Sequence, residues 1–407
     1  MNLKPIVLMC MSLMGCAEKA FEEDTGTHLR WHVLRKVEKI ASNSSKSFVR
    51  TSGLALTKDE SILVLATSTR TSVALLDPET LKLKDEIYTG DGAGQIASVN
   101  DGNHLVTWAI AGRVRKKNGW FPDVSRATDV FILDGYTGQM LHKVKVGENV
   151  GMIQDLHDGT ILVTAVHGAR ISRVHLETGK IVDQVSTRSK GFSPGYIATR
   201  PDNQIGVVTG GIYRGVGGSK GHARGTEVLV MDPMAPSERS RFEMVDGLKH
   251  PRSALFHPDG RHILIAERKR DMIVALDWVS MRTIDEKHVE HRPELLGMLP
   301  GGAHAYLSYD GAKRISRIHL ASGTIDSAIL PGTPRAWGSS RPVLSTDDRY
   351  LYVPIGDKDG IAVIELKDFA LVDFIETPKD VRSLAMNRRG DVLFATLGDG
   401  NYVACIE

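Results

Sequence analysis

Short runs of hydrophobic residues alternate with polar turns along most of the chain, and they return in a fixed order. Each unit has an apolar stretch, a turn rich in Asp and Gly, a strongly apolar stretch, a third stretch ending in Asp or Glu, a short turn and a fourth stretch. The second stretches include SILVLATS, TILVTAV, HILIAER and RYLYVPI. Their β-branched and aromatic content predicts β-strands. No long amphipathic helical pattern interrupts them.

The turn after the first strand sets the length of the unit. It recurs at roughly 42 to 57 residues, at 58–60, 100–102, 157–159, 201–203, 258–260, 300–302, 346–348 and 388–390. This spacing is typical of four-stranded propeller blades. The last unit has only three strands, and HLRWHVLRKVEKIA (28–41) supplies a spare strand that would close the ring and cover its edges. The sequence therefore predicts an all-β fold, a β-propeller of eight four-stranded blades over residues 28–407, or of seven if one unit is misread.

Two of the repeats resemble a known family. HPRSALFHPDGRHILIAERKRDMIVALD (250–277) and RPVLSTDDRYLYVPIGDKDGIAVIEL (341–366) resemble YVTN-type propeller repeats. Lactonase-like propellers and the haem d1 domain of cytochrome cd1 share such repeats. The resemblance covers nearly all of residues 28–407 and implies architecture more than function. The Trp-containing signature of quinone-type propellers is absent, which argues against a quinoprotein dehydrogenase.

The first residues differ from the repeats. Lys4 is followed by an apolar run from Pro5 to Met14, which is too short to span a bilayer as a helix and predicts a signal peptide over 1–15. The run ends in Leu-Met-Gly-Cys, which resembles a bacterial lipobox. The resemblance implies cleavage before Cys16 and lipidation of that residue, whereas the alternative is an ordinary signal peptide with a chance Cys.

A lipidated Cys16 would make residues 16–27 a short polar tether to a membrane, and several acyl chains would anchor it stably. Ala17 follows the Cys where Asp would signal the inner membrane, so the resemblance favours the outer membrane facing the periplasm, with the cell surface also open. Cys10 would leave with the signal and Cys16 would carry lipid, so Cys405 would have no disulfide partner. A body without disulfides is held by its core.

Composition adds limits on partners. The 407 residues are 42% hydrophobic, and Lys+Arg 51 against Asp+Glu 49 leave a net charge of +2. There is no global attraction to nucleic acid, and the basic loops lack interleaved aromatic residues. We therefore expect no nucleic-acid partner and a body that is monomeric.

The loops from second to third strands and from fourth strands to the next blade lie on one face of a propeller, and here many are basic. This bias predicts a mouth that attracts an anionic ligand or an acidic protein partner, whereas the alternative is a solvated polar rim. The candidate binding residues in the second-to-third loops are Arg70, Arg113, Arg115, His167, Arg170, Arg214, Lys220, His222, Arg224, Glu267 and Arg314.

The innermost strands add a further group. Alignment on the turns makes Ser52, Gly94, Gly151, Gly195, Arg252, Glu294, Ser340 and Arg382 equivalent channel-mouth positions. The small residues would leave room for a ligand, and arginines bind carboxylates and phosphates through planar contacts. Arg252, Glu294 and Arg382 are thus the central candidate site, although a structural ion pair explains Glu294 almost as well.

Catalytic and cofactor motifs are weak. In GFSPG (191–195) the residue after Ser is Pro194, which has no N–H for an oxyanion. GGIYRGVGGSKGHARGTE (210–227) joins two predicted strands, so it is no phosphate loop before a helix. No histidine pair has a diagnostic metal spacing, so we expect no metal site, no catalytic residue and no favoured cofactor.

Two hypotheses follow. The first is a lipid-anchored binding or scaffold module without chemistry of its own. The second is an enzyme or cofactor propeller, either a lactonase-like hydrolase or a haem d1-type protein. For a haem d1-type protein, His167 or His222 would be the axial ligand.

Overall fold

Thirty-four β-strands and one short 3₁₀ turn make up the described part of the computed structural model. Described are residues 34–39, 51–67, 72–90, 93–108, 112–116, 119–123, 128–190, 192–210, 227–245, 248–335, 341–398 and 402–407, of which 34–39, 51–52, 67, 112–116, 119–123, 227 and 244 are described by their backbone alone. The chain divides into Met1–Trp31 and His32–Glu407, and the second unit contains all of these residues. The predicted signal peptide (1–15) and tether (16–27) lie outside them. No helix within the described residues has the length and hydrophobicity to cross a membrane.

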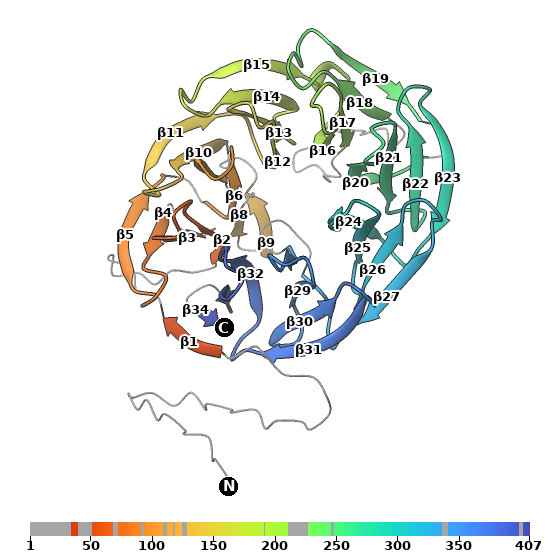
Figure 1. The fold of residues 1–407 in the computed structure, drawn as a ribbon. Coiled ribbons are helices and arrows are strands. Elements are labelled where there is room, and N and C mark those ends of the chain that lie inside the picture. The colour runs from red at the N-terminus through yellow and green to blue at the C-terminus, as the bar shows by residue number, and fades with distance from the viewer. Residues whose placement is uncertain are drawn as a thin grey trace. The chain divides into compact units, whose positions relative to one another are not determined.

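Eight four-stranded antiparallel sheets form a ring of blades (Figure 1). From the inside outward, the strands of blades 1 to 4 are β2 (Thr51–Leu56), β3 (Leu63–Thr67), β4 (Ser72–Leu76), β5 (Leu83–Tyr88); β6 (Gln95–Val99), β7 (His104–Trp108), β10 (Asp129–Asp134), β11 (Met140–Lys145); β12 (Val150–Asp155), β13 (Thr160–Ala165), β14 (Arg170–His175), β15 (Ile181–Ser186); and β16 (Pro194–Thr199), β17 (Gly206–Gly210), β18 (Glu227–Met231), β19 (Ser240–Met244). The 3₁₀ turn η1 (Arg188–Lys190) lies between blades 3 and 4.

The other four blades repeat this order. Their strands are β20 (Pro251–Phe256), β21 (His262–Glu267), β22 (Met272–Asp277), β23 (Arg282–His288); β24 (Pro293–Met298), β25 (His304–Tyr309), β26 (Arg314–His319), β27 (Ile325–Ile329); β28 (Val343–Leu344), β29 (Tyr350–Ile355), β30 (Gly360–Glu365), β31 (Ala370–Glu376); and β32 (Val381–Met386), β33 (Leu393–Leu397), β34 (Tyr402–Ile406), β1 (Leu34–Lys39). The predicted all-β propeller of eight four-stranded blades is confirmed.

Strand β1 is the outermost strand of blade 8, where it pairs antiparallel with β34. The eighth blade is therefore composite, with three strands from the C-terminal end of the chain and one from its N-terminal part. Blade 2 carries an insertion between β7 and β10. Its strands β8 (Gly112–Lys116) and β9 (Gly119–Asp123) pair as a separate two-stranded sheet.

The recurring turn has one backbone feature that explains its composition. The residue after the turn's central position has a positive φ in every blade, between 55° and 81°, at Glu60, Gly102, Gly159, Asn203, Gly260, Gly302, Asp348 and Gly390. Glycine is the residue best suited to this conformation, and Asn and Asp tolerate it better than most others. The preceding Asp holds the turn, as where Asp202 accepts the backbone N–H of Gln204 at 3.0 Å. The eight sequence turns are thus the eight first-to-second strand turns.

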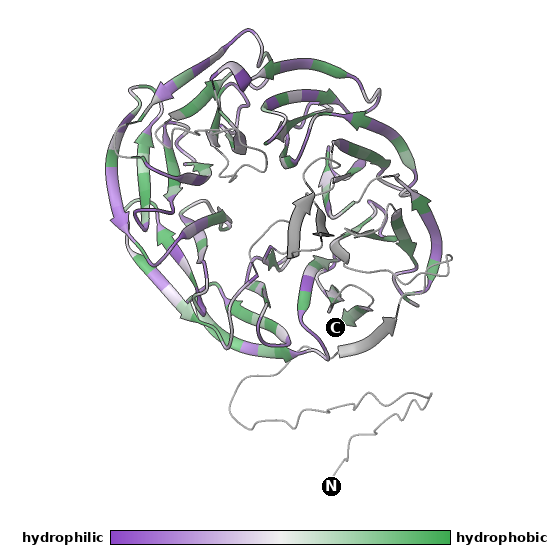
Figure 2. Ribbon diagram, turned by 180° about the vertical axis from the view of Figure 1, so that it is seen from behind, coloured by the Kyte–Doolittle hydropathy of each residue, from purple (hydrophilic) through white to green (hydrophobic). Residues whose placement is uncertain are grey.

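The core lies between the blades. The described residues form eight hydrophobic clusters, each of which joins the facing sides of two neighbouring blades. The second strands of the blades are the most deeply buried, as in β13, whereas the outer strand β5 has no buried residue. Figure 2 shows the same contrast, with mostly hydrophobic strands in the middle of the blades and mixed outer ones. One cluster packs Leu54 and Leu65 of blade 1 against Phe394 of blade 8, so blades are packed together around the whole ring.

The antiparallel order gives the ring two faces. We call the face with the second-to-third loops and the blade-to-blade loops the mouth face, and the face with the first-to-second and third-to-fourth turns the turn face. Each inner strand therefore runs from the mouth face to the turn face. Residues at the start of an inner strand, such as Arg252 in β20, lie at the mouth.

Candidate functional site

Three inner strands bring Tyr196, Arg252 and Glu294 together at the mouth. The Tyr196 hydroxyl donates a hydrogen bond to Glu294 Oε1. The Arg252 guanidinium lies over the Tyr196 ring, 5.0 Å from its centre, and Arg252 Nε is 3.7 Å from Glu294 Oε2. The hydrogen bond joins blade 4 to blade 6 past the inner strand of blade 5. Two of the three central residues predicted from the sequence, Arg252 and Glu294, therefore meet.

Irregular strand pairing places these side chains. The register of β20 against β21 shifts between Pro251 and Ala254, and Arg252 lies within that bulge. The register of β16 against β17 shifts in the same place, and Tyr196 lies within that shift. A β-bulge changes the direction of the side chain it carries. The Thr209 hydroxyl of blade 4 donates to the carbonyl oxygen of Arg252 and fixes this part of the backbone.

Burial and charge define the site's electrostatics. Glu294 is only 4% exposed. Burial raises the pKa of Tyr196 well above its usual range and the Glu294 carboxylate raises it further, so the phenol stays a proton donor. Burial also lowers the pKa of Arg268, in the turn after β21, and the neighbouring Arg252 guanidinium lowers it further. The Glu294 and Asp310 carboxylates oppose this decrease.

A carboxylate is shared next to this group. Arg268 and Arg292 each place a guanidinium nitrogen 3.1 Å from the same Asp310 Oδ2. Arg341, which precedes β28, acts electrostatically on both Tyr196 and Tyr306, where it opposes the rise in their pKa. Arg341 has no ion-pair partner among the residues that the structure describes.

Arg382, the third central residue, is part of a second arginine pair. Its Nε lies 3.1 Å from Asp380 Oδ2 and donates to the carbonyl oxygen of Gly398 at 3.0 Å. Arg335 contacts the same Asp380 oxygen at 2.6 Å. Burial lowers the pKa of Arg335, and the nearby Arg382 adds to that effect. Two arginines thus share one carboxylate here as well.

Among the described residues at the mouth, six arginines lie around three carboxylates that pair with them or face them. The arginines are Arg252, Arg268, Arg292, Arg335, Arg341 and Arg382, and the carboxylates that pair with them are Glu294, Asp310 and Asp380. An added carboxylate or phosphate would complete these groups, because guanidinium binds planar oxyanions through paired hydrogen bonds. The arrangement is therefore suited to binding an anion.

Other predicted residues have structural partners. Glu267 is fully buried, and its carboxylate accepts the backbone N–H groups of Lys249, His250 and Lys269, the last two at 2.7 and 3.1 Å. It therefore ties the blade-to-blade loop to the following turn. Arg314 forms an ion pair of 2.7 Å with Glu290.

Blade 3 contributes two predicted residues at the mouth face. His167 is half-buried in the turn after β13, and burial lowers its pKa while the Glu148 carboxylate opposes this. Arg170, the first residue of β14, is exposed. Glycine at position 151 of this blade serves packing, since a Cβ there would lie 2.9 Å from Thr164 Oγ1 and 2.8 Å from Val166 Cγ2. The small residue at this position therefore does not leave room for a ligand.

Several predicted residues lie outside what the structure describes. These are Cys16, Arg70, Arg214, Lys220, His222 and Arg224, together with the side chains of Arg113 and Arg115 in β8. The sequence analysis in turn missed Tyr196, Asp310 and Asp380. Asp380 had a usable signal, because it stands two residues before Arg382.

The fold and the described part of the mouth define the class of protein: an eight-bladed β-propeller in which pairs of arginines share carboxylates at one end of the channel. No family model and no curated protein matches the chain. Solved structures with a similar fold include the following two. The β-propeller domain of Myceliophteria thermophila Cps50 (Swd1) has 11% identity and a TM-score of 0.55, over 76% of this chain and 94% of that one. Dihydro-heme d1 dehydrogenase NirN in complex with DHE has 14% identity and a TM-score of 0.60, over 83% and 68%.

Proposed function

We propose that this chain is a binding module of the bacterial cell envelope, a lipid-anchored propeller that holds a carboxylate or phosphate group at its arginine-rich mouth. The group belongs to a small anionic ligand or to an acidic partner protein. One observation carries the proposal: at the mouth, arginines share carboxylates. Ion pairs that only stabilise a fold do not need such an excess of positive charge.

We expect the guanidinium group of Arg252 to be the main contact of the bound anion. Its guanidinium is held between the Tyr196 ring and the Glu294 carboxylate, but at 3.7 Å its Nε is beyond hydrogen-bond distance of Glu294 Oε2. An incoming oxyanion would compete with Glu294 for Arg252 and draw Arg268 toward the same group. Pre-organised arginines lose little side-chain freedom on binding.

The test is direct titration of the purified full chain by calorimetry with citrate and with inorganic phosphate. We expect Arg252→Gln to weaken binding at least about tenfold, since one charge-assisted contact is lost. The matched control is Arg261→Gln, because Arg261 lies on the turn face with Asp277 as its own partner at 2.8 Å. Equal affinities for wild type, variant and control would refute the proposal. Binding of a poly-glutamate peptide but of neither small anion would assign the mouth to an acidic protein partner.

The envelope location rests on the sequence alone, on the lipobox-like Leu-Met-Gly-Cys that ends at Cys16. Expression of the full chain and of Cys16→Ser in a bacterial host tests it by membrane fractionation. The wild type should sediment with the membranes and the variant should be released as a soluble protein. A variant that stays with the membranes would contradict lipid anchoring at Cys16.

A second candidate function, a haem d1-type cofactor protein, is favoured by the likeness to NirN, which covers 83% of this chain. The arginines of the mouth would suit the carboxylates of such a cofactor. His167 is the predicted axial ligand that can be located, and it lies half-buried in the blade 3 turn. An absorption spectrum of protein purified from its native membrane decides the matter. A visible band would support this function, and a colourless protein would remove it.

A further inference from the structure

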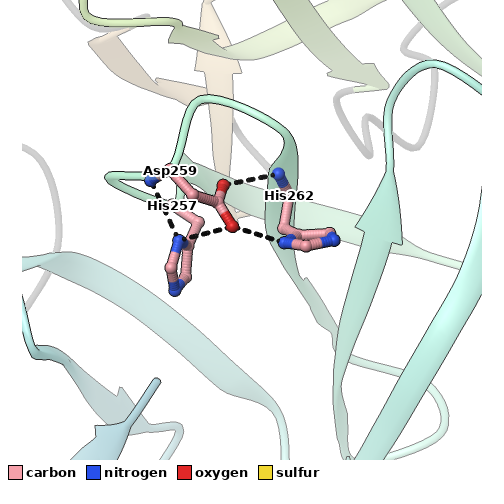
Figure 3. Close-up of side chains that lie close together, drawn as sticks. All are labelled: His257, Asp259 and His262. Atoms are coloured by element: carbon pink, nitrogen blue, oxygen red, sulfur yellow. Dashed lines mark hydrogen bonds and ion pairs between the residues drawn. The ribbon is translucent and has the colours of Figure 1, made fainter. Parts of the chain in front are cut away.

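The turn that joins β20 to β21 gathers His257, Asp259 and His262 (Figure 3). His257 Nδ1 lies 3.0 Å from Asp259 Oδ2, and His262 Nδ1 lies 2.5 Å from the same oxygen. Both rings therefore point a nitrogen at one carboxylate. The side chains are 25%, 36% and 32% exposed in chain order. The group is open enough for an ion and a water molecule to reach it.

The same turn in other blades shows that the fold does not require these histidines. An Asp at this position caps the turn in blades 1, 3, 4 and 7, through backbone N–H bonds like those that Asp259 accepts from Arg261 and His262. The residues that flank it at the histidine positions there are Thr57 and Ile62, Leu156 and Ile161, Arg200 and Ile205, and Ser345 and Tyr350. Two imidazoles beside the Asp carboxylate are therefore particular to blade 5 among these five turns.

The turn is also braced from three sides. Trp278 Nε1 donates to the carbonyl oxygen of Gly260 at 2.9 Å. Gly302 of blade 6 lies so close to Pro258 that a Cβ on it would be 3.1 Å from the proline ring. The nearby cation, Arg261, is directed to Asp277 at 2.8 Å and leaves the Asp259 carboxylate to the histidines. A braced turn keeps the three ligand atoms together and lowers the cost of binding.

We propose that His257, Asp259 and His262 form a binding site for a divalent transition-metal ion of the Zn²⁺ type. The ligands would be the two Nδ1 atoms and one carboxylate oxygen, with water in the remaining position. Bonds of about 2.0–2.1 Å place tetrahedral ligand atoms roughly 3.3 Å apart, which is longer than the spacings of 3.0 and 2.5 Å in this structure. The turn would open slightly on metal binding. His257 Nδ1 would also lose the hydrogen bond of 3.1 Å that it accepts from the backbone N–H of Asp259.

Ligand chemistry selects the metal. Imidazole nitrogen suits Zn²⁺, Cu²⁺ and Ni²⁺, whereas Mg²⁺ and Ca²⁺ prefer oxygen ligands alone. The site also differs in place from the anion site. Arg252 is the second residue of β20, at the mouth, and His257 follows the end of that strand, so five residues of extended chain separate them by roughly 17 Å. The proposed metal site can therefore be tested independently of the proposed function.

The experiment is calorimetric titration of the full chain with Zn²⁺ alone. We expect His262→Gln and Asp259→Asn each to lose at least about tenfold in affinity for one equivalent of the ion. The side-chain amide in Asp259→Asn would keep an oxygen that can accept the turn's N–H groups, so the turn should persist. The matched control is His304→Gln, because His304 begins β25 as His262 begins β21 and packs on His319 at 4.9 Å without a carboxylate between them.

A second measurement keeps the test independent of folding. X-ray absorption of the one-equivalent complex should show two imidazoles in the zinc shell, and His262→Gln should remove one of them. Mg²⁺ should not compete. The proposal is overturned if the wild type binds no Zn²⁺, if the variants bind it as the wild type does, or if His304→Gln loses as much affinity.

Discussion

Three arginines of the turn face, Arg173, Arg261 and Arg317, each have a carboxylate of their own. Arg173 pairs with Asp158 at 2.7 Å, Arg261 with Asp277 at 2.8 Å, and Arg317 with Asp326 at 2.8 Å. At the mouth the pattern changes, because Arg335 and Arg382 share Asp380, and Arg268 and Arg292 share Asp310. The outer mouth-face residues Arg270 and Arg314 are again paired singly, with Glu286 and Glu290.

The comparison separates charges that hold the fold from charges that are available to a ligand. Singly paired arginines join turns to neighbouring strands and leave little net field. Arginines that share a carboxylate around the channel leave positive charge in excess in a partly buried space, where electrostatic attraction is least screened. Substitutions on the two faces should therefore differ in which property they change.

The largest effect on stability should come from Glu267→Gln. The amide NH₂ of Gln would face the backbone N–H groups that the buried carboxylate now accepts, so donors would be left unsatisfied. We expect a loss of about 2–4 kcal/mol in the free energy of unfolding by urea. The control is Glu286→Gln, whose ion pair with Arg270 is partly exposed and should cost less than about 1 kcal/mol. Similar losses for both variants would contradict the structural role of Glu267.

Glu294→Gln should change both stability and binding. Gln keeps an oxygen for the Tyr196 hydroxyl but removes the charge that faces Arg252, so unfolding should become easier by about 2 kcal/mol. Phosphate should nevertheless bind several-fold more tightly, because Arg252 loses its internal competitor. Unfolding in urea and calorimetric titration measure the two effects. Weaker phosphate binding by this variant would show that Glu294 belongs to the ligand's contacts instead.

Low pH should destabilise the fold through carboxylates of the turn face, such as Asp77. Backbone and side-chain hydrogen bonds from Thr80, with Lys84 nearby, lower the pKa of Asp77 to about 2 from an ordinary value of 3.8. Its contribution is therefore present above the unfolded pKa and is lost as the pH falls from about 4 toward 2. Asp77→Asn should flatten the pH dependence of unfolding in that range, as followed by circular dichroism. An unchanged slope would show that Asp77 has no linkage to folding.

The smallest effect should come from Arg173→Gln on the turn face. Its ion pair with Asp158 is partly exposed, so stability should change by less than about 1 kcal/mol. Anion binding at the mouth should not change at all. The same titrations with phosphate provide the measurement. A binding loss as large as that of Arg252→Gln would mean that anions sense the net charge of the whole protein.

Much of the fold could be predicted because each blade contains the same turn, and the conformation of that turn depends on only a few neighbouring residues. The third position of the turn has a positive φ, which favours Gly, and it recurs in all eight blades. The alignment on this turn also placed Arg252 and Glu294 at equivalent positions, the second residues of β20 and β24. The position of the turn in the sequence was therefore sufficient to predict which residues are equivalent in the inner strands.

The contacts of the site could not be predicted in the same way. Tyr196 reaches Glu294 because bulges in the inner strands turn side chains toward the channel, and no sequence signal marks those register shifts. Asp380 and Arg335 lie in loops 45 residues apart whose meeting depends on the packing of blade 7 against blade 8. The group that we propose to bind metal was not predicted from the sequence, because the Asp at its centre also caps the turn, as it does in other blades.

The central claim is that the shared arginines of the mouth bind an anion, and phosphate-dependent thermal unfolding tests it most directly. The double variant Arg252→Gln/Arg382→Gln is compared with Arg173→Gln/Arg261→Gln, which removes the same charge from the turn face. Saturating phosphate should raise the melting temperature of the wild type and of the turn-face variant by the same few degrees, and should leave the mouth variant unchanged. Equal stabilisation of both double variants would contradict the account.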